Sequence, residues 1–189
     1  MSIIVVVRKH DKAVIAADTM QSDDSLQLRA PYVRNHEKIV RFNDTLVGLA
    51  GWAAAQDIFE SVVRHHTDKL DFGSRAAIFE TARNLHKLMK DDYHIDTQEE
   101  KDQPVESSQL AMLIANPGGI FEIDSYRTVS EYARFWALGS GRNLALGAMF
   151  SAYDQTDDAA AIARRGVEAA CEFDDGCGMP MNLYEVPLG

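Results

Sequence analysis

The sequence predicts a four-layer αββα sandwich, in which two antiparallel sheets are stacked face to face and helices cover both outer faces. Three observations lead to this fold class. The 189 residues are 46% hydrophobic, which suffices for one sizeable core. Short β-branched runs come in pairs, and these pairs alternate with pairs of amphipathic segments. We therefore expect a single domain over residues 1–189.

The first strands begin almost at the start of the chain. Ile3 to Val7 and Lys12 to Ala17 are apolar runs separated by a polar turn, which is typical of a hairpin of buried strands. We expect a loop from Ser22 to Arg34. Lys38 to Phe42 and Thr45 to Ala50 then predict a second strand pair.

The middle of the chain changes from strand to helix period. Apolar residues at spacings of three and four predict two amphipathic helices, one around Ile58 to Val63 and one around Ile78 to Met89. Asp91 to Ser108 is polar and highly charged, so we expect an exposed loop or a frayed helix end there. The remaining pattern is three strands, two helices and a strand, over residues 109–115, 120–123, 135–138, 143–153, 158–170 and 181–186.

The composition excludes several classes of function. A net charge of -10 opposes binding to a phosphate backbone, so nucleic acid is not an expected partner. No apolar run reaches the roughly 18 residues of a membrane span, and the first charges follow the first apolar run, the reverse of a secretory signal. We expect a cytoplasmic protein without membrane association, whose Cys171 and Cys177 are reduced thiols.

Familiar catalytic signatures are absent from the sequence. The six histidines form no HExxH pair, which argues against a metal site. Ser140 lies in Leu138-Gly139-Ser140-Gly141, which lacks the second glycine of a GxSxG nucleophile elbow. Leu144 stands where a dinucleotide fingerprint needs its third glycine, and there is no Walker lysine. We expect neither a metal nor another cofactor.

Ser2 offers a different chemistry. Methionine aminopeptidase removes Met1 when the next residue is small, which would leave Ser2 with a free α-amine. Such an amine has a pKa of about 7.7 to 8.0 and accepts the proton of the adjacent hydroxyl, so one residue holds nucleophile and base. If Met1 stays, that nitrogen is a peptide amide and the mechanism fails. Met-Ser starts are common processing sites, so Ser2 is informative only together with its surroundings.

Four segments supply those surroundings: Ser2-Ile3-Ile4-Val5-Val6-Val7-Arg8, Val14-Ile15-Ala16-Ala17-Asp18, Glu37-Lys38-Ile39-Val40-Arg41 and Val47-Gly48-Leu49-Ala50-Gly51. In these segments, and in its layout over nearly the whole chain, the sequence resembles the proteasome β-subunit and HslV family of N-terminal nucleophile hydrolases. It is most similar to bacterial members of the betaproteobacterial type. The resemblance implies the N-terminal nucleophile hydrolase fold, which is itself an αββα sandwich.

The resemblance assigns roles to residues near the N-terminus. It implies that Ser2 is the nucleophile and that Lys38 lowers the pKa of the Ser2 hydroxyl through its charge, while Asp18 pairs with Lys38. Gly48 matches the glycine whose backbone N–H forms the family's oxyanion hole. A glycine required only for packing is the alternative at that position. Serine stands at position 2 where the family usually has threonine.

Later residues complete the network that the resemblance implies. Ser140 matches the serine of a Gly-Ser-Gly sequence near the α-amine, and Asp174 and Cys177 match a late aspartate and serine. Cysteine at 177 departs from the family pattern, and Asp175 is the alternative to Asp174. By the same matching, the substrate cleft is lined by Met20, Ser22, Leu46 and Ala50.

The resemblance implies a self-compartmentalised endopeptidase that cleaves unfolded proteins or peptides inside a double ring. A homo-oligomeric tetradecamer of two heptameric rings is favoured, with an HslV-like dodecamer of two hexameric rings as the alternative. An ATPase unfoldase is the implied partner. Two rival interpretations remain: a ring-forming scaffold with weak or no activity, and a small-molecule amidohydrolase that uses the same N-terminal chemistry.

Overall fold

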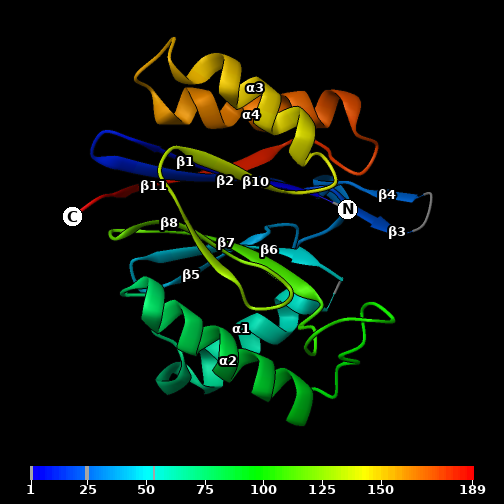
Figure 1. Cartoon of the computed structure of the whole chain (residues 1–189). Helices are drawn as coiled ribbons and strands as arrows, with labels where there is room; N and C mark the ends of the chain where they lie inside the picture. Colours follow the sequence, from blue (N-terminus) through cyan, green and yellow to red (C-terminus); the bar gives the residue numbers. More distant parts are fainter. Residues whose placement is uncertain (1, 24–25, 53) are drawn as a thin grey trace.

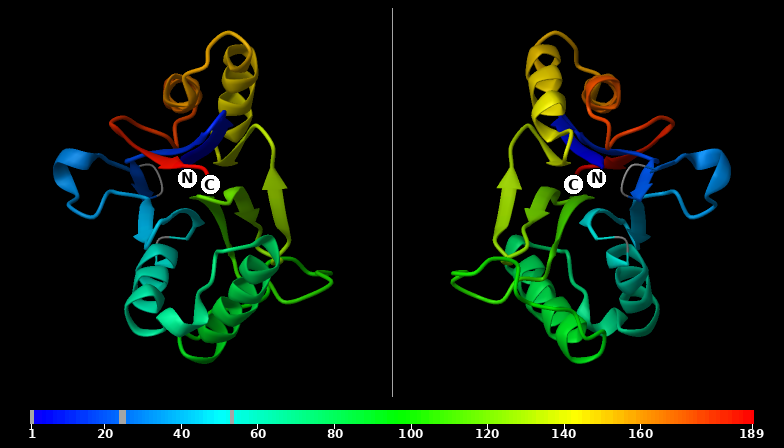
Figure 2. Two further views of the ribbon diagram at one scale, coloured as in Figure 1. Left: turned by 90° about the vertical axis from the view of Figure 1, so that its left-hand side faces the viewer. Right: turned by 90° about the vertical axis from the view of Figure 1, so that its right-hand side faces the viewer.

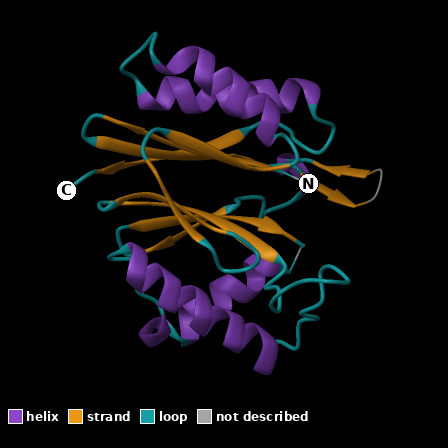
Figure 3. Cartoon of the chain, viewed as in Figure 1, coloured by secondary structure: helices purple, strands orange, loops and turns teal. Residues whose placement is uncertain are grey.

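The computed structural model describes residues 2–23, 26–52 and 54–189 and shows two stacked sheets between two pairs of helices (Figures 1 and 3). The prediction of a four-layer αββα sandwich is confirmed. The expected processing of Met1 falls on a residue outside the described ranges. None of the described helices is long and apolar enough to cross a membrane.

The N-terminal hairpin lies in the centre of a four-stranded sheet with the order β10-β1-β2-β11. All pairings in this sheet are antiparallel. Its strands are β1 (Ile3–Lys9), β2 (Lys12–Asp18), β10 (Phe135–Gly139) and β11 (Met181–Pro187). Two helices, α3 (Arg142–Tyr153) and α4 (Ala159–Phe173), cover its outer face (Figure 1).

The second sheet has five antiparallel strands in the order β5-β6-β7-β8-β9. Its strands are β5 (Ile39–Phe42), β6 (Thr45–Gly51), β7 (Leu110–Asn116), β8 (Gly119–Ile123) and β9 (Val129–Tyr132). The helices α1 (Ala55–His65) and α2 (Arg75–Asp91) cover its outer face (Figure 1).

The side chains of β1 show why the molecule has four layers. Ile3, Val5 and Val7 pack toward α3 and α4, whereas Ile4 and Val6 pack between the two sheets. Successive side chains of a strand point to opposite faces, so a strand that is apolar at every position has to be covered on both faces. Burying each such side chain contributes about 1.5–3 kcal/mol.

Two of the predicted helices have a side-chain cap at their N-terminus. The Ser74 hydroxyl accepts a hydrogen bond from the Ala77 N–H at the start of α2, and Asp158 accepts two from the first turn of α4. Such caps satisfy backbone donors that have no partner within the helix.

The segment expected to be a loop from Ser22 to Arg34 contains more structure than predicted. Two short strands, β3 (Gln21–Asp23) and β4 (Leu26–Leu28), pair in a two-stranded ribbon that projects from the side of the sandwich (Figure 2). A 3₁₀ turn, Ala30–Tyr32, follows it. The strand β9 was also not predicted. These elements are three or four residues long and contain few buried residues, so they lack the apolar alternation that marks a strand in sequence.

Candidate active site

Three strand ends bring the predicted catalytic residues to one end of the sandwich. Ser2 immediately precedes β1, Asp18 is the last residue of β2, and Lys38 immediately precedes β5. All three are buried, with Ser2 8% exposed. Ser2 and Lys38 line one cleft of about 640 Å³, which we call the Ser2 cleft.

A buried ion pair lies beside this cleft. Lys38 Nζ donates to Asp18 Oδ1 over 2.6 Å, and the two side chains are only 9% and 0% exposed. Asp18 Oδ1 also accepts the Ile3 N–H over 2.9 Å, while Oδ2 accepts the N–H groups of Gly178 and Met20 over 3.0 and 3.3 Å. Burying a carboxylate is costly unless it is paired and hydrogen-bonded, and these four donors meet that requirement. Asp18 therefore fixes the position of Lys38 relative to the first residues of β1.

The Gly-Ser-Gly segment reaches Ser2 from the other side. Ser140 Oγ lies 3.4 Å from the Ser2 carbonyl oxygen, 3.2 Å from Asp174 Oδ1 and 3.9 Å from Cys177 Sγ. A hydroxyl has one hydrogen, so Ser140 donates to one of these acceptors at a time. Asp174 Oδ1 also accepts the Gly176 N–H over 2.7 Å. The structure thus joins Ser140 to Asp174, whereas the carbonyl of Asp175 accepts from Gln27 instead.

Cys177 is buried in this network as a neutral thiol. Burial, and then the negative charges of Asp18 and Asp174, raise the pKa of Cys177 to about 12. The thiolate is the reactive form of cysteine, so this side chain is a poor nucleophile at neutral pH.

Three glycines permit the close approach of these segments, and their role was not foreseen from the sequence. Gly139 has a φ of +110°, and a Cβ there would lie 2.1 Å from the Ser2 carbonyl oxygen. A Cβ at Gly141 would lie 3.0 Å from Cys177 Sγ, and one at Gly178 would lie 2.8 Å from Met20 Sδ. The Gly-x-Gly pattern around Ser140 was the available signal for the first two.

Gly48 lies in the middle of β6, in register with Ile39 and Leu113. A Cβ at Gly48 would lie 2.6 Å from Ile4 Cγ2, so a glycine is required here for the two sheets to pack. That contact agrees with the packing interpretation of this glycine. The oxyanion role that the resemblance implies for its N–H stays a prediction.

The expected cleft residues fall into two groups. Met20 and Ser22 line the Ser2 cleft. Leu46 is 1% exposed and packs between the sheets, and Ala50 packs against the same cluster, so neither is among the lining residues. The reason is the two-residue period of β6, which turns residues 46, 48 and 50 toward the other sheet. The other lining residues of the Ser2 cleft were not predicted from the sequence; they are Gln21, Leu28, Asn35, Leu49, Gly51, Trp52, Ala54, Ala55, Gln56 and Asp57.

The family model for the proteasome subunit matches residues 2–186 of the chain. This chain belongs to the proteasome subunit family. Two structures of the proteasome-like protein Thiobacillus denitrificans BPH, one of them in complex with epoxomicin, are 39% identical to it. Each superposes with a TM-score of 0.92 over 99% of this chain and 98% or 99% of the other.

A more distant structure shares the fold of this proteasome subunit. Eukaryotic HslV from Trypanosoma brucei is 21% identical, with a TM-score of 0.73 over 98% of this chain and 99% of that one. The comparison with curated proteins finds no match. The resemblance to the proteasome and HslV family that the sequence predicted is confirmed.

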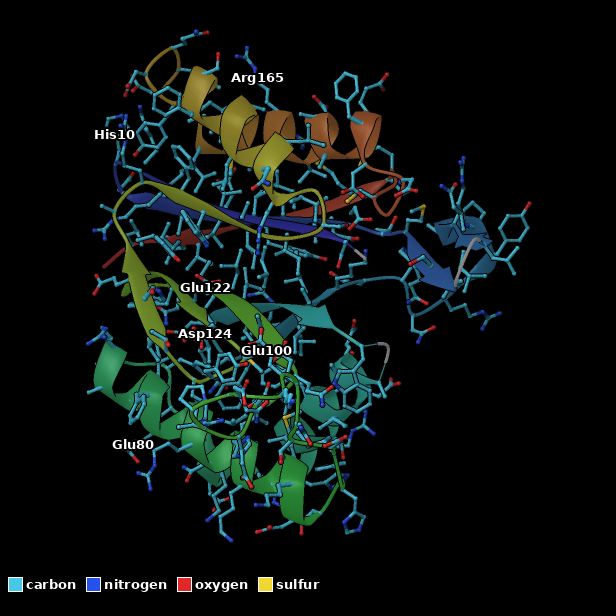
Figure 4. The ribbon with its side chains drawn as sticks, turned by 45° about the vertical axis from the view of Figure 1, so that its right-hand side comes forward. His10, Glu80, Glu100, Glu122, Asp124 and Arg165 are labelled. Atoms are coloured by element: carbon cyan, nitrogen blue, oxygen red, sulfur yellow. The ribbon has the colours of Figure 1, made fainter. Side chains whose placement is uncertain are left out.

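Candidate metal ligands do not gather in the proteasome subunit. Within residues 2–23, 26–52 and 54–189, no group of three or more His, Cys, Asp or Glu side chains is arranged to hold a metal ion. Ionisable side chains such as His10, Glu80 and Arg165 point outward from turns and helices (Figure 4).

Proposed function

We propose that this proteasome subunit is an N-terminal nucleophile peptidase, in which Ser2 attacks the peptide once Met1 has been removed. The observation that carries the proposal is the buried Lys38–Asp18 pair, which places a positive charge at the cleft that Ser2 lines. A nearby cation favours the deprotonated forms of the Ser2 hydroxyl and of its α-amine, and so makes the hydroxyl a better nucleophile.

The first half of the reaction forms an ester. The α-amine of Ser2 takes the hydroxyl proton while Oγ attacks the scissile carbonyl, which gives a tetrahedral intermediate. Backbone N–H groups at the Ser2 cleft stabilise the charge on the former carbonyl oxygen; Gly48, the candidate that the resemblance implies, is not among the residues that line this cleft. Collapse of the intermediate breaks the C–N bond, and the protonated α-amine returns its proton to the leaving amine.

The second half restores Ser2. The same α-amine takes a proton from water, whose oxygen attacks the ester carbonyl, and the acid product leaves as Oγ regains a proton. Ser140, within 3.4 Å of the Ser2 carbonyl oxygen and 3.2 Å of Asp174, holds the backbone of Ser2 during both halves. Cys177, as a neutral thiol, fills space beside Ser140.

Family membership supports a proposal for the assembly and the substrate. We propose a cytoplasmic homo-oligomer of two stacked rings that encloses the Ser2 clefts, with unfolded proteins or peptides as substrates and an ATPase unfoldase as a partner. Two heptameric rings are the favoured arrangement and two hexameric rings the alternative. The complex of the 39% identical protein with epoxomicin supports a cleft that binds a peptide-like inhibitor.

A covalent probe tests the proposal. The intact mass of the purified protein first establishes whether Met1 has been removed. A peptide vinyl sulfone should then add to one site per chain, and digestion should map the adduct to Ser2. The matched control is Ser2→Ala, which still loses Met1 and keeps both cysteines, so any adduct left on it reports the thiols.

The rival functions give different results in the same assay. A protein that has lost Met1 and is never labelled at Ser2 would be a ring-forming scaffold. Labelling of Ser2 together with hydrolysis of small amides and no cleavage of peptides would instead indicate an amidohydrolase.

A further inference from the structure

Two consecutive residues reach from the five-stranded sheet to the four-stranded sheet. Lys38 donates to Asp18 at the end of β2, and the neighbouring Glu37 accepts the hydroxyl hydrogen of Tyr184 on β11. The space between the sheets is otherwise filled by an apolar cluster that includes Ile4, Ile15, Leu46, Leu113 and Ile120. Two of the polar bonds between the sheets thus come from the two residues that precede β5.

Residue 37 is also held from a third element. Its carbonyl oxygen accepts Gln56 Nε2 from α1 over 2.7 Å, and the Lys38 carbonyl oxygen accepts the Leu49 N–H over 3.1 Å. The backbone that carries the Lys38 side chain is therefore bound by α1 and β6, while β11 binds the Glu37 side chain.

Tyr184 is well suited to be a permanent donor in this arrangement. Its hydrogen bond to Glu37, followed by burial, raises the pKa of the Tyr184 phenol, so the hydroxyl stays protonated at the pH of the reaction. The Arg41 guanidinium, on β5 of the other sheet, lies 5.9 Å from the centre of the Tyr184 ring.

We propose that Tyr184 is a positioning residue for Lys38 and acts through Glu37, an inference that rests on the proposed peptidase function. A lysine side chain has a flexible four-carbon stem, so the place of its charge depends on the backbone at its root. The Tyr184–Glu37 bond restrains that backbone one residue before Lys38. Tyr184 itself does not line the Ser2 cleft, so it contacts neither the nucleophile nor the bound peptide through this cleft.

The proposal has a consequence that a purely structural bond would not have. A well-placed Lys38 charge lowers the pKa of the Ser2 α-amine, whereas the acidic groups on the surrounding elements, Asp18, Glu37 and Asp174, oppose this effect. When the Tyr184–Glu37 bond is lost, Lys38 spends less time at its place beside Asp18. The pKa of the α-amine then rises. As a result, the ascending limb of the pH profile, which is the range over which the rate of Ser2 labelling increases with pH, moves to higher pH.

The test is the pH profile of Ser2 labelling by a peptide vinyl sulfone in Tyr184→Phe. This variant keeps the ring and removes only the hydroxyl. We expect the rate of Ser2 labelling at pH 7 to fall on the order of tenfold and the ascending limb to move to higher pH. The reason is that a small displacement of Lys38 lowers the reactivity of Ser2, even though the substituted residue does not contact it. Glu37→Leu removes both the acceptor and the negative charge, so it is compared with Glu37→Gln, which loses the same charge but keeps an oxygen acceptor; relative to Glu37→Gln, it should show both effects.

Two further variants serve as controls. Tyr132→Phe removes the same kind of bond, from Tyr132 to Glu122, but within the five-stranded sheet and away from Lys38. Tyr132→Phe should therefore have the same ascending limb as the wild type. Glu37→Gln loses the charge of Glu37 but keeps an oxygen that accepts the Tyr184 hydrogen, so its ascending limb should lie at lower pH than that of Glu37→Leu.

The outcomes separate the two proposals. If the wild-type protein is labelled at Ser2 and Tyr184→Phe shows the same rate and the same limb, the positioning role is wrong and the peptidase function stands. A fall in melting temperature without a shift of the limb also overturns it, because that result describes a structural bond. If mature wild-type protein is not labelled at any pH, the peptidase function fails and the positioning role fails with it.

Discussion

The sandwich has a cleft at each end of β5 and β6, and the two clefts differ in chemistry rather than in size. The Ser2 cleft measures about 640 Å³. The other, which we call the turn cleft, measures about 710 Å³ and lies where the β5–β6 and β7–β8 turns meet the loop before α2. The C-terminus lies toward the turn cleft, since the Gly189 N–H donates to the Pro117 carbonyl, whereas the N-terminus lies at the opposite end (Figure 1).

Two polar side chains of the turn cleft, Asn116 and Asp71, hold its loops in place. Asn116 donates to the Phe72 carbonyl and accepts the Gly118 N–H, each over 2.8 Å, and Asp71 accepts the Gly73 N–H. The Ser2 cleft instead contains a buried ammonium whose partner is a fully buried carboxylate. A buried ion pair beside Ser2 therefore distinguishes the smaller cleft, and such buried charge is a better guide to a candidate site than volume.

The largest contrast is expected in activity. Ser2→Ala removes the attacking oxygen and should lower peptide hydrolysis by roughly 10³-fold or more, with little change in stability. Asp44→Asn in the turn cleft should leave the initial rate within about twofold, because no step of the reaction takes place there. Initial rates with a fluorogenic peptide measure both. Equal losses in the two variants would remove the distinction between the clefts.

The next contrast concerns stability. Lys38→Ala leaves the Asp18 carboxylate buried without its cation, which should reduce the free energy of unfolding by about 3–5 kcal/mol. Lys87→Ala breaks an exposed pair with Asp91 of similar length, 2.8 Å, and should produce no measurable change. Chemical denaturation of the two variants checks this. A Lys38→Ala protein as stable as the wild type would show that Asp18 is not held as a charged group.

A smaller effect is expected from backbone geometry at the Ser2 end. Gly139→Ala places a Cβ 2.1 Å from the Ser2 carbonyl oxygen at a φ of +110°, and should cost about 1–3 kcal/mol and displace Ser2. Gly147→Ala in α3 meets no atom within 4 Å and should stabilise the protein by about 0.5–1 kcal/mol. Thermal unfolding and Ser2 labelling of both variants test this prediction. The melting temperature should fall in Gly139→Ala and rise in Gly147→Ala.

The smallest effect is expected at Cys177. Its thiol, with a pKa raised to about 12, stays protonated through the working range, so its charge does not change there. Cys177→Ser should therefore leave activity within about twofold and the pH profile unchanged between about pH 6 and 9. A limb of the profile that disappears in Cys177→Ser would show instead that the thiol titrates during the reaction.

The sequence by itself determined the layers of the fold. The uninterrupted apolar runs of β1 and β2 have to be covered on both faces, and this requirement predicts layers on either side of the sheet. The helical period of the later segments predicted the outer helices. The resemblance in the N-terminal segments also identified Ser2, Asp18 and Lys38, which the structure brings to one end of the sandwich. Periodicity is a local property of the backbone, which is why it can be read without knowing the contacts.

Only the tertiary structure decided the contacts around the site. Ser140 meets Asp174 across 34 positions, and Glu37 meets Tyr184 across 147, because helices and sheets pack those segments together. The inward direction of Leu46 likewise depends on which face of β6 meets the other sheet. Pairings between residues so far apart depend on how whole sheets and helices are placed, and no local pattern along the chain contains that information.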